Sequence, residues 1–588
     1  MKKFMLMLAA STLVILIANS GMTATWPPSG FTEQAADQNT TFRDTVTTDV
    51  AVLAPLPWWF PSRPAACNSL HFLRIHHVNG PVNPSDADKI LIAQPGVLEG
   101  ASAFYNVAAN LVTRAYNEKG KFVEFWAVDR RSNCLEDNNG MRLANATGDP
   151  YDFIRYYYNN KAYKGQKFKG FLSPYTDAAW LAEMGMAQTV IDWHAIITRG
   201  IPSLSDRQSK VYLGGHSLGG FITGAYAEWD FGGKKLAKDA GYNQCAGFFG
   251  LDTTVTAEPT IDLSALISSI FNTSGQSSIL SSGLSSSNIN KTVVDLMRLG
   301  LLDRFVDLPG VINPEIMNLL TGVGYIAKVA PMAEAKAISY LPATPVIETV
   351  LRFYHSRNID DFLAATTIRN FRYTNQALLG VLMDDDSMPF FFIKTGVGFF
   401  TGGPVADKEF PISKATEDYL SSIPSLSMIS MMFGSKPLAI PTDSGGSSPG
   451  KGPLYSWLNY NQIGGVTIPN DSTGVPYTTP SKEVTDINDL ARSVGALPLN
   501  FTEYYFPMRL VIDAALGGYS GLVYPNGVSM RPVLNIKAGE SPMVMGTPPA
   551  GTPVIPGYHH LDVMTAAPVQ NDGQPEKVTT ELLKFIFP

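Results

Sequence analysis

The sequence predicts an α/β fold in which a mostly parallel sheet carries helices on both faces. Short apolar runs of strand length alternate with helix-period segments between residues 71 and 255, and this alternation resumes at residue 533. A strand-to-helix turn of the form Gly-x-Ser-x-Gly stands at Gly215–Gly219. Strands that are joined through helices run parallel, so the sheet needs helical cover on both faces.

Length and composition indicate a globular protein with more than one lobe. The chain has 588 residues, of which 45% are hydrophobic and 16% charged, and this length exceeds what one compact core holds. A second lobe or a large insertion is therefore expected. The formal net charge is −7 and no block of basic residues occurs, so nucleic acid is not an expected partner.

The N-terminus has the pattern of a secretory signal. Lys2 and Lys3 precede an apolar run, Phe4–Ala18, that is too short for a comfortable membrane span. Small residues within Ser20–Ala24 offer cleavage sites. We expect residues 1–24 to be a cleavable signal peptide and the mature protein to be secreted or periplasmic.

Residues 25–255 are expected to hold the first part of the sheet. After an irregular lead-in over 25–65, apolar runs of strand length end at polar or Pro-Gly sequence and alternate with amphipathic runs of helix length. The expected strands are His71–Val78, Lys89–Ala93, Phe122–Val128, Lys210–Leu213 and Gly247–Leu251, and the expected helices are Ala101–Tyr116 and Trp180–Thr198.

The alternation stops between residues 256 and 520. This segment holds several helical patterns and many Met, Phe, Leu and Ile residues, so a large, mainly helical insertion that forms a cap or lid is expected. Residues 521–588 then complete the sheet, with a strand at Val533–Ala538 and a closing helix at Lys577–Phe587.

The turn around Ser217 has the context of a nucleophile elbow. A strand-like run precedes it and a helix-forming segment follows it, while the glycines at positions 215 and 219 let strand and helix approach closely. Such a turn lifts one hydroxyl to the top of a sheet at a helix N-terminus, where the N–H groups favour a developing negative charge. Ser217 is therefore the expected nucleophile.

These features resemble the α/β-hydrolase superfamily, in the style of its lipases and esterases, over roughly residues 65–255 and 525–588. The resemblance implies a mostly parallel, eight-stranded sheet, a catalytic order of Ser, then Asp or Glu, then His, and a cap over the active site. The segment 256–520 resembles no family that we can name, so it adds no family information.

A histidine pair near the C-terminus supplies candidates for the base. The sequence Gly557–Asp562 follows an apolar stretch that suits a last strand, and it contains His559 and His560. In acid lipases of the superfamily the base precedes Leu-Asp, so the resemblance carries this role to His560, with His559 as the alternative. A neutral imidazole is suited to accept the proton of a serine. His216, inside the elbow, is expected to pack beside the nucleophile.

Two carboxylates compete for the role of the orienting acid. Members of the superfamily usually carry it after the strand that ends here at Ala538, but at the matching position this sequence has Ser541, with Glu540 one residue earlier. Pancreatic-type lipases carry their acid after the preceding strand, in a Gly-Leu-Asp context like that of Asp252. Either carboxylate could hold the imidazole in the required tautomer, so both Glu540 and Asp252 stay open.

An oxyanion hole needs two N–H donors that point to where negative charge develops. The resemblance places one at Leu218, directly after the nucleophile, and the other in the loop after Lys89–Ala93. His-Gly is common in that loop, whereas this sequence has Pro95-Gly96. The expected second donor is therefore Val97, with Leu98 as the next candidate.

Three cysteines allow at most one internal disulfide, and export would permit it. In the superfamily the antiparallel second strand neighbours the fourth. If His71–Val78 and Phe122–Val128 are these strands, Cys67 precedes one and Cys134 follows the other at the same edge of the sheet. We therefore expect a Cys67–Cys134 bridge and a buried free thiol at Cys245.

The sequence as a whole favours a secreted serine hydrolase that cleaves small-molecule or lipid carboxylic esters through an acyl-enzyme intermediate. No metal or cofactor is implied, because the other histidines lack ligand spacing. The alternatives are a peptidase or amidase of the same fold and a non-catalytic binding protein. The apolar residues of 256–520 either favour acyl or aromatic groups and transient contact with a lipid interface, or simply form the core of the insertion.

Overall fold

The computed structural model of the chain describes residues 26–36, 42–258, 286–308, 312–364, 368–411, 437–446, 450–517, 520–542 and 550–588. The segment 1–24, with its predicted signal peptide, lies outside the described residues. Within the described ranges, no helix is both long enough and apolar enough to cross a membrane.

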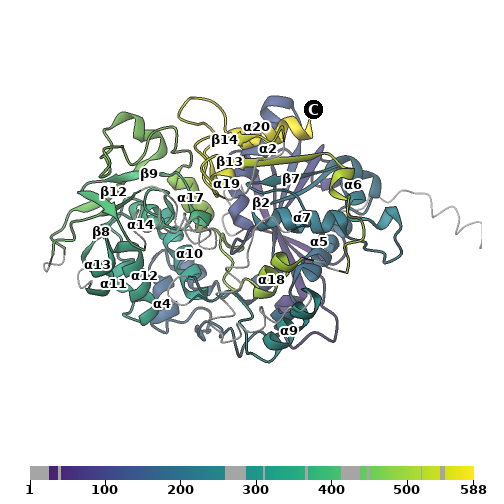
Figure 1. The fold of residues 1–588 in the computed structure, drawn as a ribbon, viewed down its shortest axis with the longest axis horizontal. Helices are drawn as coiled ribbons and strands as arrows, with labels where there is room; N and C mark the ends of the chain where they lie inside the picture. The colour runs from purple at the N-terminus through teal and green to yellow at the C-terminus, as the bar shows by residue number, and fades with distance from the viewer. Residues whose placement is uncertain are drawn as a thin grey trace, which may run out of the picture.

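The centre of the molecule is one large, mostly parallel sheet, as predicted (Figure 1). The six strands from β5 to β14 run parallel, and β1, β2 and β3 continue the sheet antiparallel at one edge. In spatial order the strands are β1 (Phe31–Ala35), β2 (Thr45–Leu53), β3 (Ser69–His77), β5 (Val123–Asp129), β4 (Lys89–Gln94), β6 (Val211–His216), β7 (Gly247–Leu251), β13 (Val533–Ala538) and β14 (Val554–Ile555).

The sheet has nine strands rather than the expected eight, because the lead-in is not irregular. Strand β2 pairs with β3 along its whole length, from Thr45 opposite His77 to Leu53 opposite Ser69. Val50 and Val52 of β2 are fully buried, as alternating β-branched residues on the inner face of a strand should be. The Thr- and Asp-rich composition of this segment hid that alternation.

Helices cover both faces of the sheet, so successive strand residues are buried on opposite sides. In β4, Leu91 and Ala93 belong to the buried cluster of α2 and α20, whereas Ile90 and Ile92 belong to that of α5 and α7. This double burial explains the continuous apolar runs of the parallel strands. The helices are α2 (Tyr105–Lys119), α20 (Lys577–Ile586), α5 (Met186–Gly200) and α7 (Leu218–Glu228).

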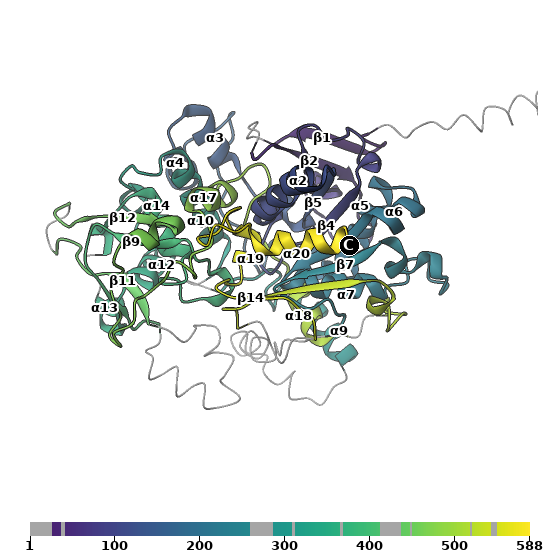
Figure 2. The ribbon, with the colours of Figure 1, turned by 90° about the horizontal axis from the view of Figure 1, so that it is seen from above.

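A second lobe, here called the insertion lobe, is built from chain between β7 and β13. Figures 1 and 2 show it beside the sheet. It is not only helical, because its described residues include five short strands beside the helices. Its elements are α10 (Pro314–Val329), α11 (Ala337–Tyr340), α12 (Pro345–His355), α13 (Ile359–Ala364), β8 (Arg372–Tyr373), α14 (Asn375–Met383), β9 (Gly398–Thr401), β10 (Val405–Lys408), β11 (Leu438–Pro441), β12 (Leu454–Asn459) and α17 (Ile487–Val494).

The insertion lobe shares its core with the sheet. Helix α17 packs against both α10 and α2, and one continuous buried cluster includes Leu111 of α2, Leu320 of α10 and Val494 of α17. Two other helices from the same stretch of sequence, α9 (Ser286–Arg298) and α18 (Met508–Leu516), pack against each other, and α18 also contacts α5. The predicted insertion therefore contributes to the packing on both faces of the sheet.

Cys67 and Cys134 form a disulfide, with their Cα atoms 5.1 Å apart. Cys67 lies just before β3 and Cys134 just after β5, and these strands pair antiparallel with His71 opposite Asp129. The two cysteines therefore meet at one edge of the sheet. Cys245 is a free and fully buried thiol.

We expect thiol counting on the denatured, unreduced protein to find one reactive thiol, and peptide mapping to assign it to Cys245. The native protein should show none, because burial raises the pKa of Cys245 and keeps reagents away. The bridge joins residues 67 positions apart, so reduction should lower the free energy of unfolding by roughly 4 kcal/mol. Three reactive thiols after denaturation would show that the bridge does not form.

Candidate active site

Ser217 stands in a strained turn at the carboxyl end of the central strand β6. It is the N-cap of α7 and has φ 52° and ψ −117°, a conformation that non-glycine residues rarely adopt. A Cβ on Gly219 would lie 2.2 Å from the carbonyl oxygen of Gln94, and one on Gly215 would lie 2.6 Å from the same atom. Only glycine fits at these two positions, so the close approach of β4, β6 and α7 forces the turn that presents Ser217.

His560 and Asp252 form a buried hydrogen-bonded pair beside this turn. Nδ1 of His560 lies 2.6 Å from a carboxylate oxygen of Asp252, and the two side chains are 2% and 0% exposed. Asp252 directly follows Leu251, whose carbonyl oxygen accepts a hydrogen bond from the N–H of Ser217. The carboxyl ends of β6 and β7 thus bring the serine and the acid to one edge of the sheet.

The surroundings of Asp252 keep it ionised. Burial alone would raise the pKa of this carboxyl, but the hydrogen bond and positive charge of His560 lower it. The hydroxyl of Ser541 and the N–H of Ala538, which lies 3.0 Å from Oδ1, lower it further, so the pKa of Asp252 lies below its usual value. Asp252 also has a positive φ of 43°, which shows that its backbone is held in place by its surroundings.

The structure pairs Asp252, and not Glu540, with His560. Glu540 is exposed, and its backbone N–H donates to the carbonyl oxygen of Tyr558. Ser541, at the position where the superfamily usually carries its acid, instead donates a hydrogen bond to Asp252. The ring of His559 points elsewhere, with its Nε2 3.0 Å from Asp385.

His560 is suited to act as a base near neutral pH. Burial lowers its pKa, and the nearby charge of His216 lowers it further, while Asp252 and Glu99 act in the opposite direction. The net effect is a pKa below the usual value. The structure has no hydrogen bond between Ser217 Oγ and His560 Nε2; in enzymes without bound substrate this contact is often long and tightens when substrate binds.

The predicted oxyanion donors lie in the loop after β4 and at the start of α7. Among the described residues, neither Val97 N–H nor Leu218 N–H donates a hydrogen bond to another group of the protein. Leu98, the second candidate, has φ 62°, and its carbonyl accepts from the N–H of Glu503. Both expected donors are therefore without an acceptor in the described part of the protein.

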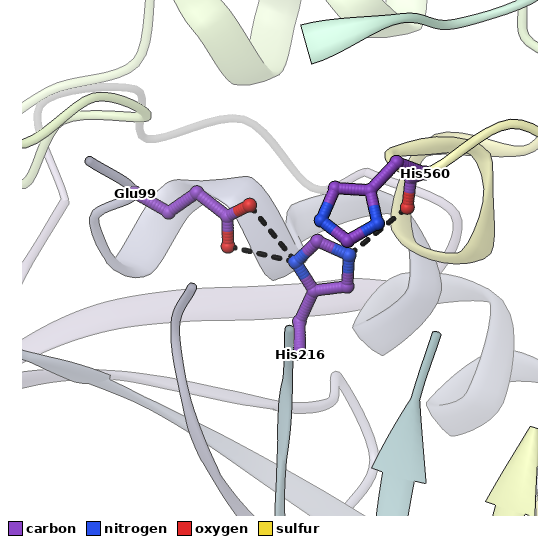
Figure 3. Close-up of side chains that lie close together, drawn as sticks. All are labelled: Glu99, His216 and His560. Carbon is purple, nitrogen blue, oxygen red and sulfur yellow. Dashed lines mark hydrogen bonds and ion pairs between the residues drawn. The ribbon is translucent and has the colours of Figure 1, made fainter. Parts of the chain in front are cut away.

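Two polar side chains that the sequence interpretation missed hold this loop. Arg130 donates to the carbonyl oxygens of Pro95, Gly96 and Glu99. The carboxylate of Glu99 accepts from Gly96 N–H at 2.6 Å and forms an ion pair with the ring of His216 (Figure 3). For Glu99, the only signal in the sequence is that it is a single carboxylate in an otherwise apolar stretch. This pattern does not by itself predict a buried ion pair.

Among the described residues, two groups of side chains have ligand atoms close enough together for a metal ion. One is Glu99, His216 and His560, where both ring nitrogens of His216 and Nδ1 of His560 already contact protein groups. The other consists of three consecutive buried carboxylates, Asp384–Asp386. An all-oxygen set of this kind suits Ca²⁺ or Mg²⁺. Asp384 in this second group already accepts backbone N–H groups of Asp386 and Val397.

An apolar cavity lies between the loop after β4 and the insertion lobe. The cavity volume is about 90 Å³, several times the roughly 10–15 Å³ that one water molecule needs. On one side it is lined by Val97, Leu98 and Glu99 of the loop after β4 and by Leu561, the residue after His560. Its other walls are formed mainly by apolar side chains of α10, α11, α12 and α14.

Comparisons with known proteins add little to this geometry. No family model matches the chain, and no curated protein sequence matches it. Among solved structures, the chain is similar to the peroxisomal α/β-hydrolase Lpx1 of Saccharomyces cerevisiae, with 13% sequence identity and a TM-score of 0.18. The match covers 38% of this chain and 46% of Lpx1, which is less than half of either protein.

Proposed function

We propose that this protein is a serine hydrolase of the α/β-hydrolase type that cleaves carboxylic esters with an apolar acyl group. The observation that carries the proposal is the 2.6 Å contact between His560 Nδ1 and Asp252 beside the strained Ser217 turn. A serine, a histidine and a buried carboxylate in chain order Ser, Asp, His at the carboxyl edge of a parallel sheet are the parts that acyl transfer needs.

In this mechanism Ser217 Oγ attacks the ester carbonyl carbon while Nε2 of His560 takes the hydroxyl proton. Asp252 keeps the proton of the neutral imidazole on Nδ1, so that Nε2 can accept, and it stabilises the imidazolium that forms. The backbone N–H groups of Val97 and Leu218 stabilise the oxyanion, helped by the N-terminus of α7.

Departure of the alcohol completes the acyl-enzyme, and water then releases the acyl group with the help of the same residues. His560 gives its proton to the leaving alkoxide, and the acyl group stays on Ser217. A water molecule then attacks the acyl carbonyl carbon and passes a proton to His560. The Ser217–acyl bond breaks, Ser217 recovers its proton, and the carboxylic acid leaves.

The apolar cavity supports an ester with a hydrocarbon acyl group over a peptide. Its lining includes one carboxylate, Glu99, and that carboxylate is already engaged by His216. A peptidase that binds a chain terminus would need an available charge in the cleft. Because Val97 and Leu561 line the cavity, an acyl chain whose carbonyl lies against the Val97 N–H could extend into it.

Export is part of the same proposal. A disulfide between Cys67 and Cys134 suits an oxidising compartment, and the apolar N-terminal run suits a secretory signal. The protein would then act outside the cytoplasm, in the periplasm or beyond it, on a small-molecule or lipid ester. Contact of the insertion lobe with a lipid interface stays a prediction.

We expect rates on a p-nitrophenyl ester series to rise from acetate to medium-length acyl chains, and matched p-nitroanilides to be poor substrates. A Val350→Trp variant should shift the best acyl length downward, because Val350 lines the cavity from α12. The matched control is Val346→Trp, one turn earlier on the same helix and not part of the lining, which should leave the length profile unchanged. Faster anilide than ester hydrolysis would favour the peptidase alternative.

A further inference from the structure

The ring of His216 joins two loops of the site. Its Nδ1 lies 2.8 Å and 2.9 Å from the two carboxylate oxygens of Glu99, and its Nε2 lies 2.9 Å from the backbone carbonyl oxygen of His560 (Figure 3). His216 is fully buried and Glu99 is 6% exposed. The residue directly before the nucleophile therefore links the loop after β4 to the loop of the base.

The hydrogen-bonding partners require His216 to donate from both ring nitrogens. A carbonyl oxygen can only accept, so Nε2 must carry a proton toward His560. Nδ1 faces an ionised carboxylate and must carry one as well. Burial alone would lower the pKa of His216, but the charge and hydrogen bond of Glu99 and the charge of Asp252 raise it above its usual value. The hydrogen-bond partners and the raised pKa both indicate that His216 is an imidazolium.

The surroundings of Glu99 keep its carboxylate ionised and fixed in position. Burial alone would raise its pKa, but the charge and hydrogen bond of His216, the charge of His560 and the N–H of Gly96 hold the pKa below its usual value. Its second role is mechanical, because the bond to Gly96 N–H, at 2.6 Å, closes the turn that contains Val97. The ion pair thus fixes the turn that offers the proposed oxyanion donor.

We propose that Glu99 and His216 are positioning residues of the hydrolase: their buried ion pair holds the Val97 turn and the backbone of His560 in register with Ser217. This inference rests on the proposed function. It explains why a carboxylate and a histidine, both costly to bury, occur inside the loop and the elbow that catalysis needs most. Truncating one partner would leave the other in a buried position without its counter-charge, which explains why the pair matters for the structure.

The pair also bears on the protonation of His560. The charged groups that act on His560 are Asp252, His216 and Glu99, and among them the lowering effect of His216 exceeds the raising effect of Glu99. Replacing Glu99 by Gln would remove the carboxylate charge, and His216 would then lose the partner that raises its pKa and would become neutral. The net lowering effect would be lost, so the pKa of His560 would rise.

Glu99→Gln is the sharpest test, because glutamine keeps an acceptor for Gly96 N–H and removes only the charge. We expect kcat per active site, counted with a fluorophosphonate that labels Ser217, to fall about 10- to 100-fold with KM nearly unchanged. The acid limb of the pH profile of kcat/KM should move to higher pH, because the pKa of His560 rises. In His216→Gln the lowering effect of His216 is removed while the carboxylate of Glu99 can stay charged. The pKa of His560, and with it the acid limb, should therefore rise further than in Glu99→Gln.

Glu540→Gln, the same chemical change at an exposed carboxylate, is the matched control and should change neither kcat nor the profile. Counting labelled sites removes any unfolded fraction, and His216→Gln provides a second reading if Glu99→Gln folds poorly. Wild-type kcat per labelled site with an unshifted acid limb in either variant would overturn the proposal. If the wild-type protein does not label at Ser217, the proposed function itself fails.

Discussion

Ser217→Ala and His560→Ala are each expected to reduce ester hydrolysis by about 10³-fold or more, with the fold intact. The alanine at position 217 leaves no nucleophile to form the acyl-enzyme. The alanine at position 560 leaves no base to take the serine proton, and the residual rate would come from the oxyanion donors and substrate binding alone. The measurement is kcat/KM on a p-nitrophenyl ester for purified wild type and variants.

Control measurements distinguish loss of a catalytic side chain from loss of the folded structure. Thermal unfolding of Ser217→Ala should match that of the wild type. His560→Ala leaves the buried Asp252 carboxylate without its partner, so it should unfold at a somewhat lower temperature while keeping the native fold. A fluorophosphonate should label wild-type protein at Ser217 and should not label Ser217→Ala. His559→Ala should retain most of the activity, because its ring contacts Asp385 and not Asp252. Labelling at another serine, or full activity in Ser217→Ala, would refute the proposed nucleophile.

Asp252→Asn is expected to reduce kcat by about 10³- to 10⁴-fold. An asparagine amide can donate to Nδ1 of His560, which moves the ring proton to Nε2 and prevents Nε2 from accepting the serine proton. The positive charge that forms on His560 would also lose its partner, which lies 2.6 Å away in the wild type. Steady-state kinetics at saturating ester measures the effect.

Glu540→Gln is the matched comparison for Asp252→Asn. Glu540 is exposed, so we expect wild-type kcat and a change in the free energy of unfolding of no more than about 0.5 kcal/mol. The reverse result, with loss of activity in Glu540→Gln and retention in Asp252→Asn, would restore the alternative acid. If both variants keep wild-type kcat, the proposed Ser–His–Asp arrangement is wrong.

Much of the fold could be predicted because it depends on local patterns. The parallel strands are buried on both faces, so they appear as continuous apolar runs, and the amphipathic helices between them show the helical period. Strand β2 was missed because its Thr and Asp residues break the apolar run, and only pairing with β3 along nine residues makes it a strand. The short strands of the insertion lobe also depend on pairing partners far away in the chain.

The acid of the site shows what local sequence could not decide. Glu540 and Asp252 both follow strands whose carboxyl ends lie at the same edge of the sheet, so either was compatible with the motif. The choice depends on the direction of side chains around His560. Asp252, with its positive φ, accepts hydrogen bonds from Ala538 and His560, whereas Glu540 lies at the exposed surface.

The sequence by itself determined the parallel sheet, the strained turn at Ser217 and the histidine that follows the last strand, because each depends on residues close together in the chain. The tertiary structure decided the partner of His560, the ion pair of Glu99 with His216 and the cavity against the insertion lobe. Each of these joins side chains more than 100 positions apart, and their contacts depend on how the strand ends and the lobe pack in space.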